Sequence, residues 1–116
     1  ILETWCADAG ASCELFQSNH EGAIVDRIQQ AWFDGVDGIV MNPAAYTHTS
    51  VAILDALKAT AIPTVEVHIS DVSTREAFRH HSYVSLAAKH TIIGHGIDGY
   101  REGIEWLARE LRAGRL

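Results

Sequence analysis

The sequence predicts an α/β fold in which an open parallel sheet carries helices on both faces. The main observation is an alternation along the chain between short apolar runs and stretches with helical periodicity. The chain has 116 residues, of which 47% are hydrophobic and 21% are charged, with no low-complexity tract. This length and this composition suit one globular domain with a single buried core.

Four apolar runs are predicted to be the strands of the sheet. They are residues 12–18, 38–43, 62–70 and 91–96. Each run is followed by a segment with helical spacing, which is the pattern of crossover connections between parallel strands.

Helices are predicted at residues 1–9, after Ser18, at 48–60, after Ser73 and at 97–115. Gly10 ends the first helix, and capping-box spacing marks the start of two others, at Ser18 with Glu21 and at Ser73 with Glu76. The helix after Ser18 is predicted to carry Ile24, Val25, Ile28, Ala31 and Trp32 on one face. The last helix is predicted to bury Ile97, Tyr100, Ile104, Leu107 and Leu111.

The chain begins inside a predicted helix, although sheets of this kind are wound from strand–helix–strand units. In a flavodoxin-like strand order, a strand ahead of Ile1 would lie in the middle of the sheet. Without that strand, two rows of backbone groups would be unpaired. We therefore expect residues 1–116 to be a single flavodoxin-like domain that is N-terminally incomplete, with about 25 to 40 residues ahead of Ile1.

Composition argues against several classes of function. The net charge is −6 and no basic face is evident, so nucleic-acid binding is not expected. No apolar run is long enough to span a bilayer, and we expect a cytoplasmic protein. Cys6 and Cys13 match neither a disulfide framework nor a zinc motif. No glycine-rich nucleotide-binding motif occurs.

Polar side chains gather where the predicted strands end. Because ligands bind at the carboxyl ends of parallel strands, these side chains are candidates for one shared site. They are Asn42, His48, Glu66, His68, Ser70 and Arg79.

Glu66 and His68 are two residues apart on a predicted strand, so their side chains point to the same face. An imidazole beside a carboxylate keeps its proton more readily and suits a general acid. The alternative is a strand-end pair without a catalytic role, which is the more common meaning of an isolated pair. If Ser70 begins a loop, its free backbone amide suits an anion.

The remaining histidines do not have the spacing of metal ligands. Adjacent His80 and His81 on a helix would point about 100° apart, and no paired-histidine zinc motif occurs, so no metal site is expected. His48 and Asp55 are seven residues apart on a predicted helix and share a face. Since they are separated by about 10 Å along the axis, a single site would use only one of them.

Four blocks of sequence, in this order and spacing, resemble the type II 3-dehydroquinate dehydratases. The blocks are "QSNHEG", "NPAAYTHTSVAILDAL", "IPTVEVHIS" and "REAFRHHSYVS". The resemblance continues through "GIDGY" into the last helix. It implies a flavodoxin-like hydro-lyase without a cofactor, which removes water from 3-dehydroquinate by an anti elimination through an enolate. Such enzymes serve aromatic biosynthesis by the shikimate pathway or quinate breakdown, and their trimers usually assemble into homododecamers.

The resemblance also implies roles for individual residues. His68 resembles the general acid that protonates the departing hydroxyl, and Glu66 the residue that keeps it charged and oriented. Asn42 is similar to the asparagine that binds substrate and helps to place the acid. His48 and Arg79 resemble residues that hold the ring hydroxyls.

Three further residues match positions around the substrate carboxylate and the subunit contacts. The backbone amides of Ile69 and Ser70, with the Ser70 hydroxyl, would bind the carboxylate. Asp55 resembles an aspartate that reaches the site of a neighbouring subunit.

The sequence departs from the family pattern in two places. The family's N-terminal strand, with its lid arginine and the catalytic tyrosine, has no counterpart, and Tyr46, Tyr83 and Tyr100 lie in other blocks. Ala44 stands where the family commonly has glycine, which matters if that position requires a positive φ. We expect the 116 residues alone to be inactive and the full-length protein to be an active dehydratase. The main alternative is a catalytically dead binding protein that lacks the lid tyrosine; flavin or nucleotide binding and metal-dependent hydrolysis rank below it.

Overall fold

A computed structural model describes residues 1–116. The α-helices are α1 (Leu2–Asp8), α2 (Glu21–Phe33), α3 (Val51–Thr60) and α4 (Asp98–Arg112). The strands are β1 (Ile39–Met41), β2 (Thr64–His68) and β3 (His90–Ile93). The 3-10 helices are η1 (Ala44–His48), η2 (Val72–Thr74), η3 (Ala77–His80) and η4 (Val84–Leu86). None of the helices has the length and apolar character needed to cross a bilayer.

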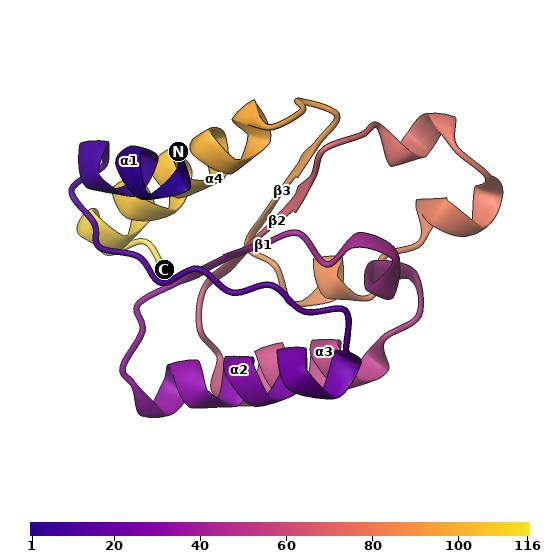
Figure 1. The fold of residues 1–116 in the computed structure, drawn as a ribbon, viewed down its shortest axis with the longest axis horizontal. Helices are drawn as coiled ribbons and strands as arrows, with labels where there is room; N and C mark the ends of the chain where they lie inside the picture. The colour runs from indigo at the N-terminus through magenta and orange to yellow at the C-terminus, as the bar shows by residue number, and fades with distance from the viewer.

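The three strands form one parallel sheet in the order β1-β2-β3, so β2 is the central strand. The register aligns Met41 of β1 with Glu66 of β2, and His68 of β2 with Ile93 of β3. Helices α1 and α4 lie on one side of the sheet, and α2 and α3 on the other (Figure 1). The predicted open parallel sheet with helices on both faces is therefore confirmed.

Two apolar clusters hold the helices in place. The cluster on the α2 and α3 side contains Ile28, Ile53, Ala56, Leu57 and Val84. The cluster on the α4 side contains Val65, Val67, Ile92 and Leu107. Because side chains alternate along a strand, the two valines of β2 face α4 while Glu66 and His68 face the opposite side.

Helix α4 packs closely on the sheet because Gly103 carries no side chain. A Cβ atom at that position would lie 3.2 Å from Val65 and 3.3 Å from Val40. The prediction for the inward face of this helix is wrong at Ile97, whose side chain is 52% exposed. Ile97 lies one residue ahead of the helix, which begins only at Asp98, so it does not share the helical face.

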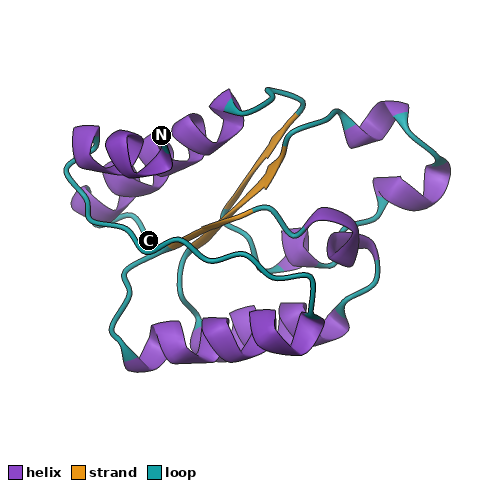
Figure 2. Ribbon diagram, viewed as in Figure 1, coloured by secondary structure: helices purple, strands orange, loops and turns teal.

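The strand predicted at residues 12–18 is absent. Residues 11–18 form no regular element and are drawn as loop in Figure 2. Leu15 and Phe16 are each more than half exposed. The apolar pattern was present, but a strand also needs a neighbour to accept and donate its backbone hydrogen bonds, and this segment pairs with none of the three strands.

Helix α2 begins at Glu21 rather than directly after Ser18, and it lacks the predicted capping box. The Ser18 hydroxyl accepts a hydrogen bond from the backbone N–H of His20 at 3.0 Å, and the N-cap residue is His20 itself. Ile28 and Ala31 are buried, whereas Trp32 is 57% exposed and packs edge-on against Phe33 in the last turn. Trp32 therefore lies at the exposed end of the apolar face of α2.

The helix predicted at residues 48–60 consists of two elements. The Ser50 hydroxyl caps α3 by accepting a hydrogen bond from the N–H of Ile53 at 2.9 Å, so the α-helix begins at Val51. His48 belongs to η1 instead. The prediction that His48 and Asp55 share one helical face is therefore wrong, because they lie on different elements.

Residues 71–81 form a projection that is built from the 3-10 helices η2 and η3 (Figure 1). A short helix capped by Ser73 and Glu76 was predicted here. Instead, the Asp71 carboxylate accepts a hydrogen bond from the N–H of Ser73 at 3.0 Å and caps η2, while Glu76 precedes η3 without a capping bond. The acidic side chain two positions before the predicted cap takes the role, as aspartate often does at helix starts.

Candidate active site

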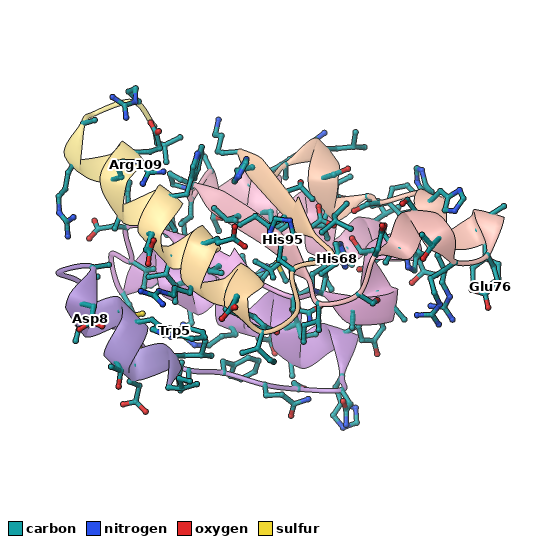
Figure 3. All side chains as sticks on the ribbon, turned by 90° about the horizontal axis from the view of Figure 1, so that it is seen from above. Trp5, Asp8, His68, Glu76, His95 and Arg109 are labelled. Carbon is teal, nitrogen blue, oxygen red and sulfur yellow. The ribbon has the colours of Figure 1, made fainter.

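The predicted site residues lie around the carboxyl ends of the strands. Strand β1 ends at Met41, directly before Asn42, and β2 ends at His68, directly before Ile69 and Ser70. Parallel strands place these ends along one edge of the sheet. Figure 3 places His68 near the middle of the molecule, with Glu76 at the far end of the projection.

Glu66 and His68 form a buried hydrogen-bonded pair. Nε2 of His68 donates to Oε2 of Glu66, and the side chains are 6% and 0% exposed, respectively. The other ring nitrogen, Nδ1, has no hydrogen-bond partner in the chain. The imidazole is therefore anchored on one side and free to donate a proton on the other.

Three hydroxyl groups surround the Glu66 carboxylate. Thr47 Oγ1 and Ser82 Oγ donate to Oε2 at 3.0 Å and 2.8 Å. Thr91 Oγ1 approaches Oε1 at 3.4 Å. Every neighbour of this carboxylate is therefore a donor, which suits an ionised acid in a buried position.

The pKa of Glu66 reflects two opposing effects. Burial raises the pKa, because the charged form loses its hydration. Hydrogen bonds from His68, Ser82 and Thr47, together with the charge on His68, outweigh burial and hold the pKa of Glu66 below its usual value. The carboxylate therefore stays ionised near neutral pH and holds the His68 ring in one orientation.

The side chain of Asn42 is held at both ends of its amide. Its Nδ2 donates to the hydroxyl of Tyr100 at 3.0 Å, and its Oδ1 accepts from the N–H of Ala44 at 2.9 Å. Ala44 has φ +51°, so this position does adopt the left-handed conformation that glycine tolerates best. The turn after β1 thus presents Asn42 in one fixed orientation.

His48 and Arg79 lie in segments that flank the buried pair. Nδ1 of His48 donates to the backbone carbonyl of His81 at 2.7 Å, which leaves Nε2 free. Arg79 donates from Nε to Glu76 at 2.6 Å, and its guanidinium stacks over Phe78. Arg79 forms no hydrogen bond with His68 or Asn42, so no direct polar contact joins it to their cluster.

The segment directly after β2 offers three free donors. The backbone amides of Ile69 and Ser70 donate to no other group of the chain, and the Ser70 hydroxyl also lacks a partner. The carbonyls, in contrast, are used: those of His68 and Ile69 accept from Gly94 at 3.1 Å and Gly96 at 3.0 Å. Two amides held in place beside an imidazole can bind a carboxylate.

Asp55 lies outside this cluster. Its side chain is exposed on α3 and makes no hydrogen bond or ion pair within the chain. The three tyrosines are also engaged elsewhere than at His68: the Tyr46 hydroxyl donates to the Asn19 carbonyl at 2.8 Å, Tyr83 packs edge-on against His81, and Tyr100 accepts from Asn42.

No three histidine, cysteine or acidic side chains are placed together to hold a metal ion. The two histidines that follow Arg79 are both exposed. His80 reaches the Arg75 carbonyl at 3.1 Å, and His81 packs against Tyr83. Both contacts support the projection rather than a ligand site.

Sequence reasoning missed Thr47, Ser82 and Tyr100. Each contacts a predicted site residue from a distant part of the chain, with Tyr100 lying 58 positions from Asn42. The one available signal was position: Thr47 precedes His48 and Ser82 follows Arg79 by three residues. Serine and threonine are too common in loops for that signal to single them out.

A family model for class II dehydroquinases matches residues 1–108. The 3-dehydroquinate dehydratase of Janthinobacterium sp. (strain Marseille) is 54% identical over 105 residues, which are 90% of this chain and 72% of that protein. The catabolic 3-dehydroquinase 1 of Aspergillus terreus (strain NIH 2624 / FGSC A1156) is 61% identical over 99 residues, 85% of this chain and 64% of that protein.

Solved structures give the same result. The crystal structure of the type II dehydroquinase from Butyrivibrio crossotus DSM 2876 superimposes with a TM-score of 0.87 at 50% sequence identity. The match covers 90% of this chain and 72% of that one. At this identity, the similarity extends beyond the fold to the family.

Proposed function

We propose a reaction and a proton donor for this chain from one premise: it belongs to the class II dehydroquinase family. The reaction is the removal of water from 3-dehydroquinate to give 3-dehydroshikimate. The observation that carries the assignment of the donor is the buried Glu66–His68 pair at the carboxyl end of the central strand.

His68 serves as the general acid. Elimination expels a hydroxyl group, and hydroxide leaves readily only if it takes up a proton as the carbon–oxygen bond breaks. Protonated His68 can donate that proton from Nδ1, the ring nitrogen without a partner in the chain. Glu66 binds the opposite nitrogen, so it orients the ring and favours its charged form.

Two groups of donors position the substrate. The amides of Ile69 and Ser70 and the Ser70 hydroxyl bind its carboxylate directly beside the acid. Asn42 and His48 present fixed polar groups to the ring hydroxyls. Arg79 joins them when its guanidinium releases Glu76 and binds substrate; the Arg79–Glu76 pair is partly exposed, so breaking it costs little.

The enolate intermediate requires a base for the proton next to the ketone. We assign that role to none of Tyr46, Tyr83 and Tyr100, because each is engaged away from His68. The alternative of a catalytically dead binding protein is not favoured, since the similar proteins named above are called dehydratases or dehydroquinases.

We further propose that the domain works in the cytoplasm as a homo-oligomer built from trimers, and without a cofactor. Asp55 supports this assembly, because an exposed carboxylate without a partner in its own chain is available to a neighbouring subunit's site. The mass of the native protein in solution tests the assembly: a multiple of three chains is expected, and a monomer would contradict it.

The activity is tested on the full-length protein with 3-dehydroquinate. The product contains a carbon–carbon double bond conjugated to a ketone, so its formation is followed by ultraviolet absorbance. Turnover that persists in excess chelator is expected. Binding of 3-dehydroquinate without any absorbance change would favour the dead binding protein instead.

A further inference from the structure

We propose that Thr47 and Ser82 are positioning residues for the dehydration, which act through Glu66 on the acid His68. They also join the two segments that carry His48 and Arg79 to the acid. This inference rests on the proposed function, because it concerns the same site. Neither residue is expected to contact substrate.

The first step of the argument is that three donors meet at one oxygen atom. Oε2 of Glu66 accepts from Nε2 of His68, from Thr47 at 3.0 Å and from Ser82 at 2.8 Å. The hydroxyls of Thr47 and Ser82 are themselves 2.5 Å apart, although the two residues are 35 positions apart in sequence. Thr47 is fully buried, so its hydroxyl has no access to water as a substitute partner.

The second step concerns the protons. The Ser82 hydroxyl accepts from the N–H of Ser85 at 3.2 Å and donates its own proton to Glu66, as Thr47 also does. Two hydroxyl protons thus serve a carboxylate that can only accept hydrogen bonds when ionised. Among the four side chains that surround Glu66, only His68 titrates, since Thr47, Ser82 and Thr91 stay neutral. The hydroxyls therefore hold Glu66 in the state and the orientation that His68 needs.

The third step is mechanical. Around the two hydroxyls, η1 and the segment 81–83 are joined by two more hydrogen bonds. The N–H of Tyr83 donates to the Thr47 carbonyl at 2.7 Å, and His48 donates to the His81 carbonyl at 2.7 Å. The carboxylate of Glu66 thus lies where His68, η1 and the segment 81–83 meet. Loss of a hydrogen bond from Thr47 or Ser82 to this carboxylate therefore affects the placement of all three.

The variants are Ser82→Ala and Thr47→Val, which remove one hydroxyl each with little change of volume. Thr64→Val is the matched control. Thr64 is as buried as Thr47 and lies on β2 together with Glu66, but its hydroxyl donates to the Ile62 carbonyl instead of to Glu66. Thr47→Ser restores a hydroxyl and serves as the rescue. Circular dichroism shows whether each variant folds; if Thr47→Val does not, Ser82→Ala and Thr47→Ser still test the proposal.

The first measurement is steady-state kinetics over pH on the full-length protein. We expect kcat to fall about tenfold in Ser82→Ala and Thr47→Val, the scale of one lost hydrogen bond to a charged group. KM is expected to change less than kcat, and the acidic limb of the pH profile is expected to move to higher pH. Thr47→Ser is expected to recover most of the rate, and Thr64→Val to retain it. A fall confined to KM, or an equal fall in Thr64→Val, would overturn the positioning role.

The second measurement does not depend on activity. Carbon-13 NMR of the Glu66 carboxyl, without substrate, reports the pH at which this group takes up a proton. We expect that pH to rise in Ser82→Ala and to stay constant in Thr64→Val. An unchanged Glu66 titration would overturn the proposal, whatever the kinetics. If the wild-type protein did not dehydrate 3-dehydroquinate, the proposed function would fail, while this titration would still decide whether the hydroxyls act on Glu66.

Discussion

The molecule contains two histidine–glutamate pairs that differ in their surroundings. His68 and Glu66 lie on the central strand, with side chains 6% and 0% exposed. His95 and Glu102 lie on the loop before α4 and on α4 itself, where Nδ1 of His95 meets Oε2 of Glu102 at 2.6 Å, and both side chains are about half exposed. The pairing is similar, but only the first pair is removed from water.

Burial changes what such a pair can do. Around the exposed pair, water and salt screen the charges, and an ion pair of this kind contributes little to stability. Around the buried pair, hydroxyl groups take the place of water and keep the carboxylate charged. A fixed arrangement of donors in a site without water can hold a proton ready for transfer, which a solvated pair cannot do as well.

The largest effect that separates the two pairs is expected from removing each imidazole. His68→Ala is expected to lower kcat by about 100-fold or more, the usual scale for losing a general acid. His95→Ala is the matched control and is expected to leave kcat within about twofold. Steady-state kinetics with 3-dehydroquinate measures both variants. Near-normal turnover of His68→Ala would show that His68 is not the general acid.

The next effect concerns the two carboxylates. The pKa of Glu66 is lowered from its usual 4.5, so this group adds to stability above that pH, and the contribution is lost as pH falls through the lowered value. Glu66→Gln is expected to lower the free energy of unfolding at pH 7 by about 1 to 3 kcal/mol and to flatten its loss in acid. Urea unfolding between pH 3 and pH 7 measures this.

Glu66→Gln is also expected to shift the acidic or the basic limb of the pH profile for turnover, because His68 loses its charged partner. Glu102→Gln removes a half-exposed carboxylate and is expected to change neither the unfolding curve nor the profile. An identical pH profile for Glu66→Gln and wild type would contradict a role for Glu66 in dehydration.

A smaller effect is expected beside the buried pair, at Tyr100. Tyr100→Phe removes the hydroxyl that accepts from Asn42 but keeps the ring against the sheet. The Asn42 amide then loses one of its two anchors, and we expect kcat to fall about threefold to tenfold, in line with one neutral hydrogen bond. Tyr46→Phe, whose hydroxyl contacts Asn19 instead, is the control in the same assay.

The smallest effect is expected from the backbone next to Asn42. Ala44 and Ala61 both have positive φ, +51° and +54°, and glycine adopts this conformation without the steric cost. Ala44→Gly and Ala61→Gly are each expected to raise the free energy of unfolding by about 0.5 to 1 kcal/mol. Thermal unfolding measures both. A destabilised Ala44→Gly beside a stabilised Ala61→Gly would show that the Cβ of Ala44 supports the turn.

Most of the fold could be predicted because periodicity is a local property. The spacing of Ile104 and Leu107 identified α4, and the apolar run around Val65 identified β2, although only the structure places β2 at the centre of the sheet. Boundaries were less certain, since they depend on which polar side chain reaches a free backbone group. Ser50 caps α3, which begins at Val51 rather than at His48, and Asp71 rather than Ser73 caps η2.

The candidate site was predictable where chemistry and spacing coincide. Glu66 and His68 were identified because two residues of separation on a strand always place side chains on one face. Arg79 could not be placed in this way, because its neighbours depend on the path of the projection, where it pairs with Glu76.

The order of apolar and polar residues alone determined the α/β class, the strand that carries Glu66 and His68, and the placement of these two side chains on one face, because these depend on near neighbours in the chain. The tertiary structure alone decided that Thr47, Ser82 and Tyr100 complete the site, and that residues 12–18 form no strand. Hydrogen bonds between distant segments, and the pairing that makes a strand, depend on where the folded chain brings its parts together.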